Sequence, residues 1–151
     1  MVSLQPITES NRAAVLALRV SPEQEQFVSG VEDSIAEAAA EPDGRAIQWA
    51  LCSGDAPVGF VMIADDVGSP DYFPQYLWKL LIDRDHQRQG YGTAALDLVA
   101  DYFRRSGDAT VMTTSAGQGD GSPIPFYERY GFVRTGDIVF DDEVLLRYRL
   151  R

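Results

Sequence analysis

A glycine-containing loop lies between two regular apolar patterns near the middle of the chain. The run YLWKLLI at residues 76–82 is mostly apolar, as in a buried strand. After it comes QRQGYG at residues 87–92, and then Leu96, Val99 and Phe103 recur at the three- and four-residue spacing of an amphipathic helix. The sequence therefore predicts a strand, a tight turn and a helix in close succession.

Such a turn is suited to binding a phosphate group. The first backbone amides of a helix have no partner within the helix and carry about half a positive charge. Glycine in the turn lets an anion approach the backbone closely. We expect the backbone of residues 87–93 to form a concave anion site, with Arg88 as an additional donor. It would be the one clearly electropositive region of a chain whose formal net charge is −10.

Other phosphate-binding loops, or a turn with no ligand, are the alternatives. The stretch GYGTAA at residues 90–95 satisfies the dinucleotide fingerprint, but residues 83–89 separate it from the preceding strand. The next strand ends in Thr113, Thr114 and Ser115, where a dinucleotide site needs an acidic residue. No Gly-Lys-Ser or Gly-Lys-Thr of a P-loop follows the glycines. A glycine turn that only connects strand and helix remains open.

Strand and helix patterns alternate along the whole chain. Runs typical of strands lie at residues 3–7, 46–52, 58–64, 76–82, 109–115, 131–136 and 143–150. Helical spacing lies between residues 8 and 21, between 27 and 42, and at 92–105 and 125–130. This order predicts a single domain at 1–151 of the α/β (α+β) class, a mixed sheet with helices on its faces.

Composition limits the expected partners. The acidic balance argues against a nucleic-acid partner and favours a cationic small molecule. No run approaches the about 18 to 20 apolar residues of a membrane helix, and the N-terminus lacks a signal-peptide pattern. We therefore expect a cytoplasmic protein with no membrane partner. The one cysteine, Cys52, is expected to be buried, and no metal site is expected.

A second motif follows the glycine loop at residues 126–132, FYERYGF, which contains Tyr127, Gly131 and Phe132. A strand, Q-x-x-G-x-G, an amphipathic helix, a strand and then Tyr-x-x-x-Gly-Phe resemble the GNAT superfamily of N-acetyltransferases. The resemblance implies the GNAT acyl-CoA N-acyltransferase fold, a mixed, mostly antiparallel sheet of about seven strands flanked by about four helices. ITESNRAAVLALRVSPEQEQFV, LLID and FYERYGF are similar to the bacterial spermine/spermidine (diamine) acetyltransferase branch.

The resemblance also implies a co-substrate, acetyl-CoA, and its binding residues. The diphosphate would lie on Gln87, Arg88, Gln89, Gly90, Tyr91, Gly92 and Thr93. The pantetheine arm would pair with the backbone of Leu81 and Ile82. Tyr127 would protonate the departing thiolate as general acid, because a phenol of pKa about 10 suits a thiolate better than a carboxylic acid of pKa about 4.

Two positions differ from the pattern of the superfamily. Where the superfamily often has an asparagine that contacts pantetheine, this chain has DGSP at residues 120–123, and Ser122 could substitute for it. The strand before the loop carries Lys79 and no carboxylate, although an acidic residue is frequent there. Both differences keep a second function open, a CoA-binding sensor without turnover.

The acceptor implied by the resemblance is a primary amine that attacks directly in a ternary complex. The acidity of the chain favours a polyamine such as spermidine or spermine. The candidates to bind the amine or take its proton are Glu25, Asp65, Asp66 and Asp71, although a solvated surface charge is the commoner role of such a residue. An antibiotic, an amino acid or a protein N-terminus is the alternative acceptor. Members of the family often form homodimers, so a homodimer also stays open.

Overall fold

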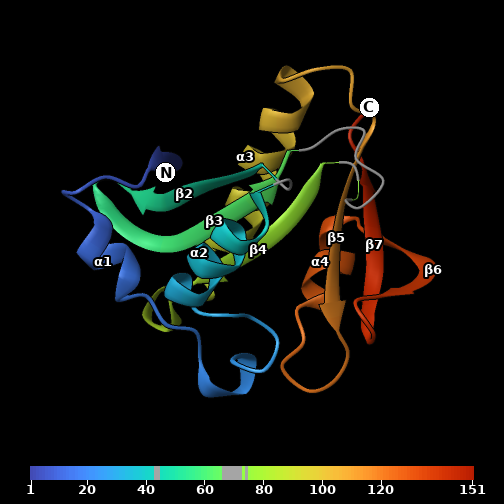
Figure 1. The fold of residues 1–151 in the computed structure, drawn as a ribbon, viewed down its shortest axis with the longest axis horizontal. Helices are drawn as coiled ribbons and strands as arrows, with labels where there is room; N and C mark the ends of the chain where they lie inside the picture. The colour runs from blue at the N-terminus through green and yellow to red at the C-terminus, as the bar shows by residue number, and fades with distance from the viewer. Residues whose placement is uncertain (43–44, 66–72, 74) are drawn as a thin grey trace.

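The computed structural model describes residues 1–42, 45–65, 73 and 75–151. Within them, seven strands form one sheet in the order β1-β2-β3-β4-β5-β7-β6 (Figure 1). The strands are β1 (Val2–Pro6), β2 (Ala46–Ser53), β3 (Ala56–Ala64), β4 (Tyr76–Ile82), β5 (Val111–Gly117), β6 (Val133–Val139) and β7 (Glu143–Arg149). Only β4 and β5 pair in parallel, and the other neighbours are antiparallel. The predicted mixed, mostly antiparallel sheet is confirmed.

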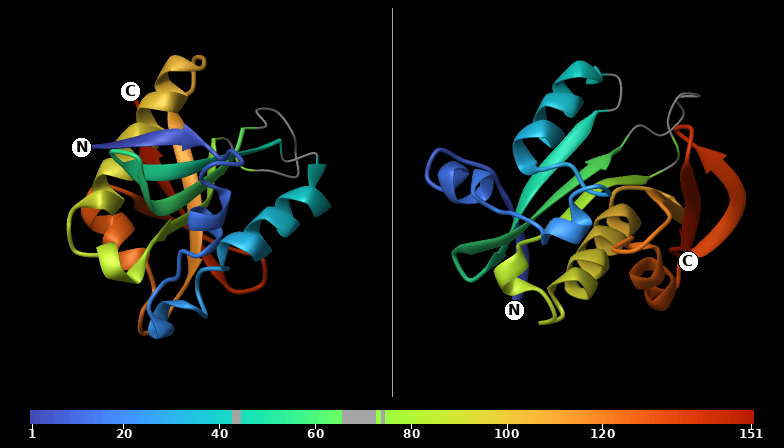
Figure 2. Two further views of the ribbon diagram at one scale, coloured as in Figure 1. Left: turned by 90° about the vertical axis from the view of Figure 1, so that its left-hand side faces the viewer. Right: turned by 90° about the horizontal axis from the view of Figure 1, so that it is seen from below.

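Helices cover both faces of this sheet (Figure 2). The α-helices of the described residues are α1 (Arg12–Leu16), α2 (Val31–Ala40), α3 (Tyr91–Arg105) and α4 (Ile124–Tyr130). Alternate residues of β3 face the two layers: Phe60 and Met62 pack in the cluster with α1 and α2, whereas Val61 and Ile63 pack in the cluster with α3 and α4. A strand buried on both faces has a continuous apolar sequence, which is why this run was recognisable.

The N-terminal helices begin and end differently from the prediction. Phe27 shares helical spacing with Val31, but α2 begins at Val31 with Gly30 as its N-cap. The Ser34 hydroxyl donates a hydrogen bond to the Gly30 carbonyl at 2.8 Å and fixes this start. Phe27 instead lies against the end of β5, where a Cβ added to Gly117 would lie 3.3 Å from the Phe27 ring. The prediction that Phe27 belongs to the helix is therefore wrong, because spacing alone does not register a cap.

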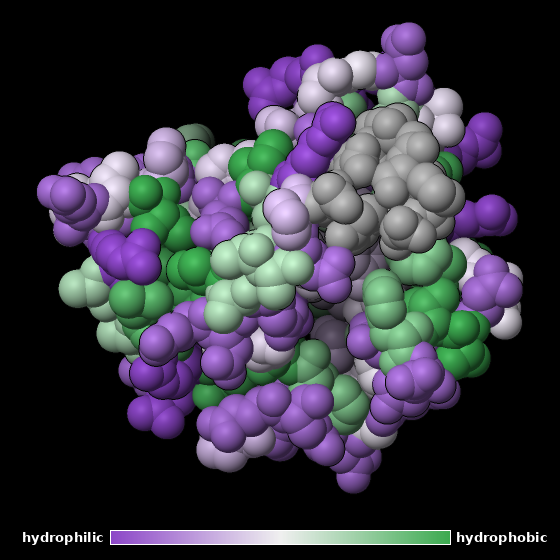
Figure 3. Space-filling view, viewed as in Figure 1, coloured by the Kyte–Doolittle hydropathy of each residue, from purple (hydrophilic) through white to green (hydrophobic). Residues whose placement is uncertain are grey.

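The two central strands diverge. Only Tyr76 and Leu77 of β4 pair with β5. From Trp78 onward, no described strand pairs with this edge of β4, although its other edge stays paired with β3 as far as Ile82. The sheet is therefore split into a β1–β4 half and a β5–β7 half, and Figure 3 shows the surface hollowed between them.

Cys52 is a free thiol in β2 and is 1% exposed, so the predicted burial is confirmed. Burial raises the pKa of this thiol. Across the described residues, none of the helices combines the length and the apolarity needed to cross a membrane.

Candidate active site

The loop between β4 and α3 begins at a fixed carboxylate. Asp83 caps the short 3-10 helix η3 (Arg84–His86) and accepts a hydrogen bond from the Arg19 amide at 2.9 Å. It also accepts from the Asp85 amide and contacts Nδ1 of His86 at 3.1 Å. Burial opposes ionisation, but these hydrogen bonds hold the pKa of Asp83 below its usual range. The loop is thereby anchored where it leaves the sheet.

The backbone at the start of α3 has amides available for an anion. Arg88 and Gly90 adopt left-handed conformations, with φ of 63° and 82°, and Gly90 caps the helix without a side-chain hydrogen bond. The first helical hydrogen bond runs from the Ala94 amide to the Gly90 carbonyl at 3.0 Å. Among the described residues, none accepts a hydrogen bond from the backbone amides of residues 91–93. These amides, at the positive end of a 15-residue helix, form a donor set that suits a diphosphate.

The side chains of the loop differ in what they contact. The side-chain amide of Gln87 donates from Nε2 to the Ile82 carbonyl at 2.9 Å and to Oε1 of Gln24 at 2.8 Å. The side chain of Gln87 therefore connects the loop to β4. Both of its N–H donors are used in these bonds, so the side chain has none left for an anion. Arg88 and Gln89 are exposed, so their side chains can reach one.

Tyr91 and Gly92 position α3 within the fold. The Tyr91 hydroxyl donates to Ser53 on β2 at 3.5 Å. A Cβ at Gly92 would lie 3.0 Å from the Phe126 ring of α4. Glycine at this position is therefore explained by close packing of α3 on α4, a reason that the sequence did not reveal. Thr93 is exposed at the rim of the loop.

Ser122 holds the start of α4. Its hydroxyl donates to the Gly117 carbonyl and accepts from the Ile124 amide at 3.2 Å. The single hydroxyl proton is thus used within the chain. Ser122 is therefore not placed as a free donor in exchange for the absent asparagine, and it instead fixes the helix that carries Tyr127.

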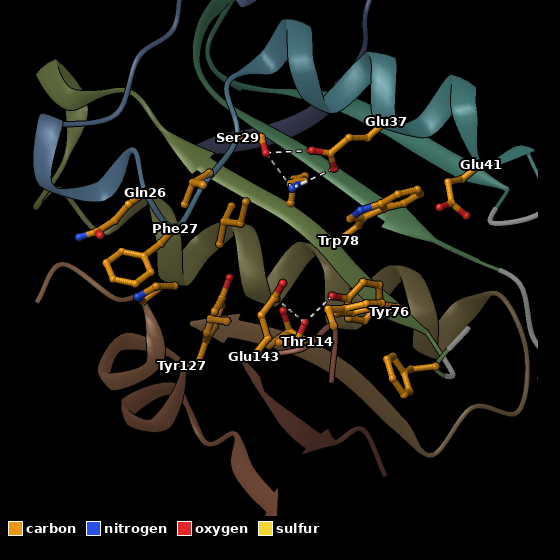
Figure 4. Close-up of a pocket in the computed structure, with 18 of the residues that line it drawn as sticks. Gln26, Phe27, Ser29, Glu37, Glu41, Tyr76, Trp78, Thr114, Tyr127 and Glu143 are labelled. Carbon is orange, nitrogen blue, oxygen red and sulfur yellow. Dashed lines mark hydrogen bonds and ion pairs between the residues drawn. The ribbon is translucent and has the colours of Figure 1, made fainter. Parts of the chain in front are cut away.

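A cavity of about 820 Å³ fills the cleft where β4 and β5 diverge (Figure 4). Its described lining includes the aromatic residues Phe27, Phe73, Tyr76, Trp78, Tyr127 and Phe140 and the acidic residues Glu25, Glu37, Glu41 and Glu143. Lys79 is the one basic side chain among these described lining residues. Carboxylates and aromatic faces both attract a cation, so the cavity is suited to a positively charged ligand.

Tyr127 reaches this cavity from α4 (Figure 4). Its ring is 5% exposed and packs between Phe126 and Phe132, at centroid distances of 5.5 and 5.4 Å. Burial raises the pKa of Tyr127 to about 12, and a hydrogen bond with Thr114 partly opposes this effect. The phenol is therefore protonated at neutral pH, and its hydroxyl is a hydrogen-bond donor.

Ionisation of Tyr127 should make the protein less stable in alkali. The phenol ionises near pH 10 in an unfolded chain but at about 12 in the folded one, so the folded state holds the proton more tightly. This stabilisation is complete below about pH 10 and is lost as the pH rises to about 12. Denaturant unfolding should show a steeper loss over this window for the wild type than for Tyr127→Phe. Parallel curves for the two proteins would contradict a buried, protonated phenol.

Lys79 pairs across the cavity with α2. Its Nζ lies 3.1 Å from Oε2 of Glu37 and donates to the Ser29 hydroxyl at 3.2 Å. Ser29 in turn donates to Oε1 of Glu37 at 2.9 Å. The packing of α2 over β4 thus brings a carboxylate to the strand position that has none of its own. Glu37 was missed by sequence reasoning because it is distant from β4 along the chain.

Of the acidic residues expected to face the substrate, the two that the structure describes, Glu25 and Asp65, lie apart. Glu25 lines the cavity. Asp65 lies apart from it, because its carboxylate accepts a hydrogen bond from Tyr102 of α3 at 3.3 Å. Asp66 and Asp71 lie outside the described residues. No three His, Cys, Asp or Glu side chains in the described ranges are grouped so that they could hold a metal ion.

Known proteins resemble this chain in both sequence and structure. The family described as Acetyltransferase (GNAT) matches residues 12–132. The spermine/spermidine N(1)-acetyltransferase of Bacillus subtilis (strain 168) is 24% identical over 157 residues, covering 96% of each chain. An acetyltransferase from Thermus thermophilus has a TM-score of 0.71 at 23% identity, covering 99% and 97% of the two chains. An aminoglycoside acetyltransferase in complex with coenzyme A has a TM-score of 0.75 at 15% identity, covering 99% and 95%.

The family match spans both motifs on which the resemblance rested, residues 87–92 and 126–132. The two similar structures show the same fold, including the mixed sheet. The predicted fold and enzyme class are therefore confirmed. From its sequence and its fold alike, the chain belongs to the acetyltransferase (GNAT) family.

Proposed function

We propose that the protein transfers the acetyl group of acetyl-CoA to a primary amine, by direct attack within a ternary complex. The observation that carries this proposal is the cavity between the diverging strands, with the Tyr127 hydroxyl in its lining. β4 leads from this cavity directly into the loop whose amides are available at the start of α3. β4 thus connects the amides at the start of α3, an anion site, to the cavity that contains Tyr127, a proton donor.

The residues along this path fit acetyl-CoA. The amides of residues 91–93, with Arg88 beside them, would hold the diphosphate. The edge of β4 that turns away from β5, including Leu81 and Ile82, would pair with the amide groups of pantetheine as an added strand does. When bound, acetyl-CoA supplies an activated thioester whose sulfur must leave with a proton.

Tyr127 would turn its hydroxyl proton from Thr114 to that sulfur, since Thr114 donates its own proton to the Leu77 carbonyl. Its pKa of about 12 keeps the proton on the phenol until negative charge develops nearby. Complete transfer is less favourable from this phenol than from one of pKa about 10. We therefore assign its main effect to hydrogen bonding in the transition state, in a site from which water is largely excluded.

A polyamine is the favoured acceptor. The described cavity lining has four carboxylates against one lysine, and that lysine is already paired with Glu37. The aromatic rings of the lining can contact both the methylene groups and the ammonium groups of such a ligand. The similarity to the Bacillus proteins named for spermine and spermidine supports the same choice, at 24% identity.

A panel of amines tests this proposal. The protein would be incubated with acetyl-CoA and with spermidine, spermine, putrescine, an aminoglycoside, free amino acids and a peptide, and products read by mass spectrometry. We expect the mass of one acetyl group on the polyamines at neutral pH. A product only from the antibiotic or the peptide would refute the polyamine assignment. Tight acetyl-CoA binding in calorimetry with no acetylated amine would instead favour a sensor.

A further inference from the structure

Three side chains from three strands form a hydrogen-bonded chain along one wall of the cavity (Figure 4). The Tyr76 hydroxyl of β4 lies 2.6 Å from Oγ of Ser115 on β5. The Ser115 hydroxyl donates to Oε1 of Glu143, the first residue of β7, at 2.8 Å. The chain connects a buried ring, Tyr76 at 6% exposed, to a half-buried carboxylate at the strand end.

The donors in this chain point in one direction. A carboxylate only accepts hydrogen bonds, and the one proton of Ser115 is directed to Glu143. Tyr76 must therefore be the donor to Ser115. The Tyr76 oxygen keeps lone pairs that can accept a hydrogen bond from a ligand in the cavity. Burial raises the pKa of Tyr76, so the hydroxyl carries its proton at neutral pH.

The amine needs such an acceptor. At pH 7 only about one in 2,500 molecules of an alkylamine with a pKa near 10.4 is neutral and able to attack. β4 offers Lys79 rather than a carboxylate, and Glu37 already accepts from Lys79 and Ser29. Glu143 is the lining carboxylate that hydroxyl groups connect to the ring of Tyr76.

Tyr76 lies among the other titratable groups of the cavity. The carboxylates of Glu143 on β7 and Glu37 on α2 raise the pKa of Tyr76, as does the Tyr127 phenol on α4 once it is ionised. Tyr127 and the chain from Tyr76 to Glu143 therefore line the same cavity.

We propose that Tyr76, Ser115 and Glu143 carry the proton of the acceptor amine out of the site. The ammonium donates to the Tyr76 oxygen, and its N–H bond breaks as a new O–H bond forms there. The former Tyr76 proton passes to Ser115, and the former Ser115 proton passes to Glu143. Both hydroxyls end as neutral as they began, and the net change is one proton moved from the amine to the Glu143 carboxylate. Tyr76 is the residue that contacts the amine, and the other two act through it: Ser115 relays the proton and Glu143 is its final acceptor.

This inference rests on the proposed function and names the proton acceptor of the same site. Glu143→Gln should lower kcat with spermidine at pH 7 by about 100-fold. The loss should shrink as the pH approaches the pKa of the amine, because the solution then supplies neutral amine. An acceptor that is already neutral at pH 7, such as trifluoroethylamine, should react with the Glu143→Gln variant within about threefold of the wild-type rate.

Further variants separate proton transfer from a structural role. Tyr76→Phe should reproduce the pattern of Glu143→Gln, and the double variant should be no slower than either alone, because residues that act as one unit are not additive. Asp142→Asn makes the same change of charge at the neighbouring exposed position and should keep wild-type rates. Acetyl-CoA affinity without amine, measured by calorimetry, should be the same in all four variants.

Two results would overturn the inference while the proposed function stands. One is a Glu143→Gln enzyme that acetylates spermidine at the wild-type rate at pH 7. The other is an equal loss with protonated and neutral amines, which would mean that Glu143 only supports the shape of the cavity. If the wild type acetylates no amine at all, the proposed function itself fails and this inference fails with it.

Discussion

Replacing Tyr127 by phenylalanine should lower kcat by at least about 100-fold and leave acetyl-CoA affinity nearly unchanged. The change removes one hydroxyl from the cavity lining, while the ring can keep its packing against Phe126 and Phe132. Thr114 keeps a partner, because its hydroxyl donates to the Leu77 carbonyl at 3.0 Å. Steady-state kinetics with spermidine would give kcat, and calorimetry would give the affinity.

Tyr130→Phe is the matched control for this experiment. It removes a hydroxyl from the same helix, but that hydroxyl donates to Asp97 of α3 at 2.7 Å. Tyr130 is not among the residues that line the cavity. Turnover by Tyr130→Phe should stay close to the wild type. If Tyr127→Phe also turns over at the wild-type rate, the phenol has no part in the reaction.

Thr93→Glu should weaken acetyl-CoA binding by about 10- to 100-fold, a loss of roughly 1.4 to 2.8 kcal/mol. Thr93 is the third residue of α3 and is exposed, so a glutamate there meets no packing obstacle. Its carboxylate can reach back to the available amides and places negative charge where the diphosphate would lie. An acid in the first turn is favourable to the helix itself, so the protein should remain folded.

Thr110→Glu is the control for the added charge. Thr110 is exposed and lies just before β5, away from the start of α3. Acetyl-CoA affinity, measured by calorimetry, should fall for Thr93→Glu alone, with thermal unfolding of both variants close to the wild type. Unchanged affinity in Thr93→Glu would mean that the diphosphate does not lie on these amides.

Much of the fold could be predicted because the decisive patterns are local. β4 spans the predicted residues 76–82, and α3 begins one residue before the predicted start at 92. β4 is a mostly apolar run and α3 is a long periodic one, and the loop that contains Gly90 separates them. Phe27 misled the prediction, since its spacing from Val31 fits a helix until Gly30 is recognised as a cap. A helix cap depends on the backbone conformation of a single residue, and the spacing of apolar residues does not predict that conformation.

The sequence by itself determined the order of the elements, the glycine loop and Tyr127 as the candidate proton donor. Only the tertiary structure decided which acidic residues reach the cavity. Glu37 and Glu143 arrive from α2 and β7, whereas Asp65 contacts α3. The physical reason is that successive residues of a strand point to opposite faces, so a carboxylate at a strand end is placed by register and by the packing of helices. The spacing of residues along the chain predicts neither the strand register nor the packing of the helices.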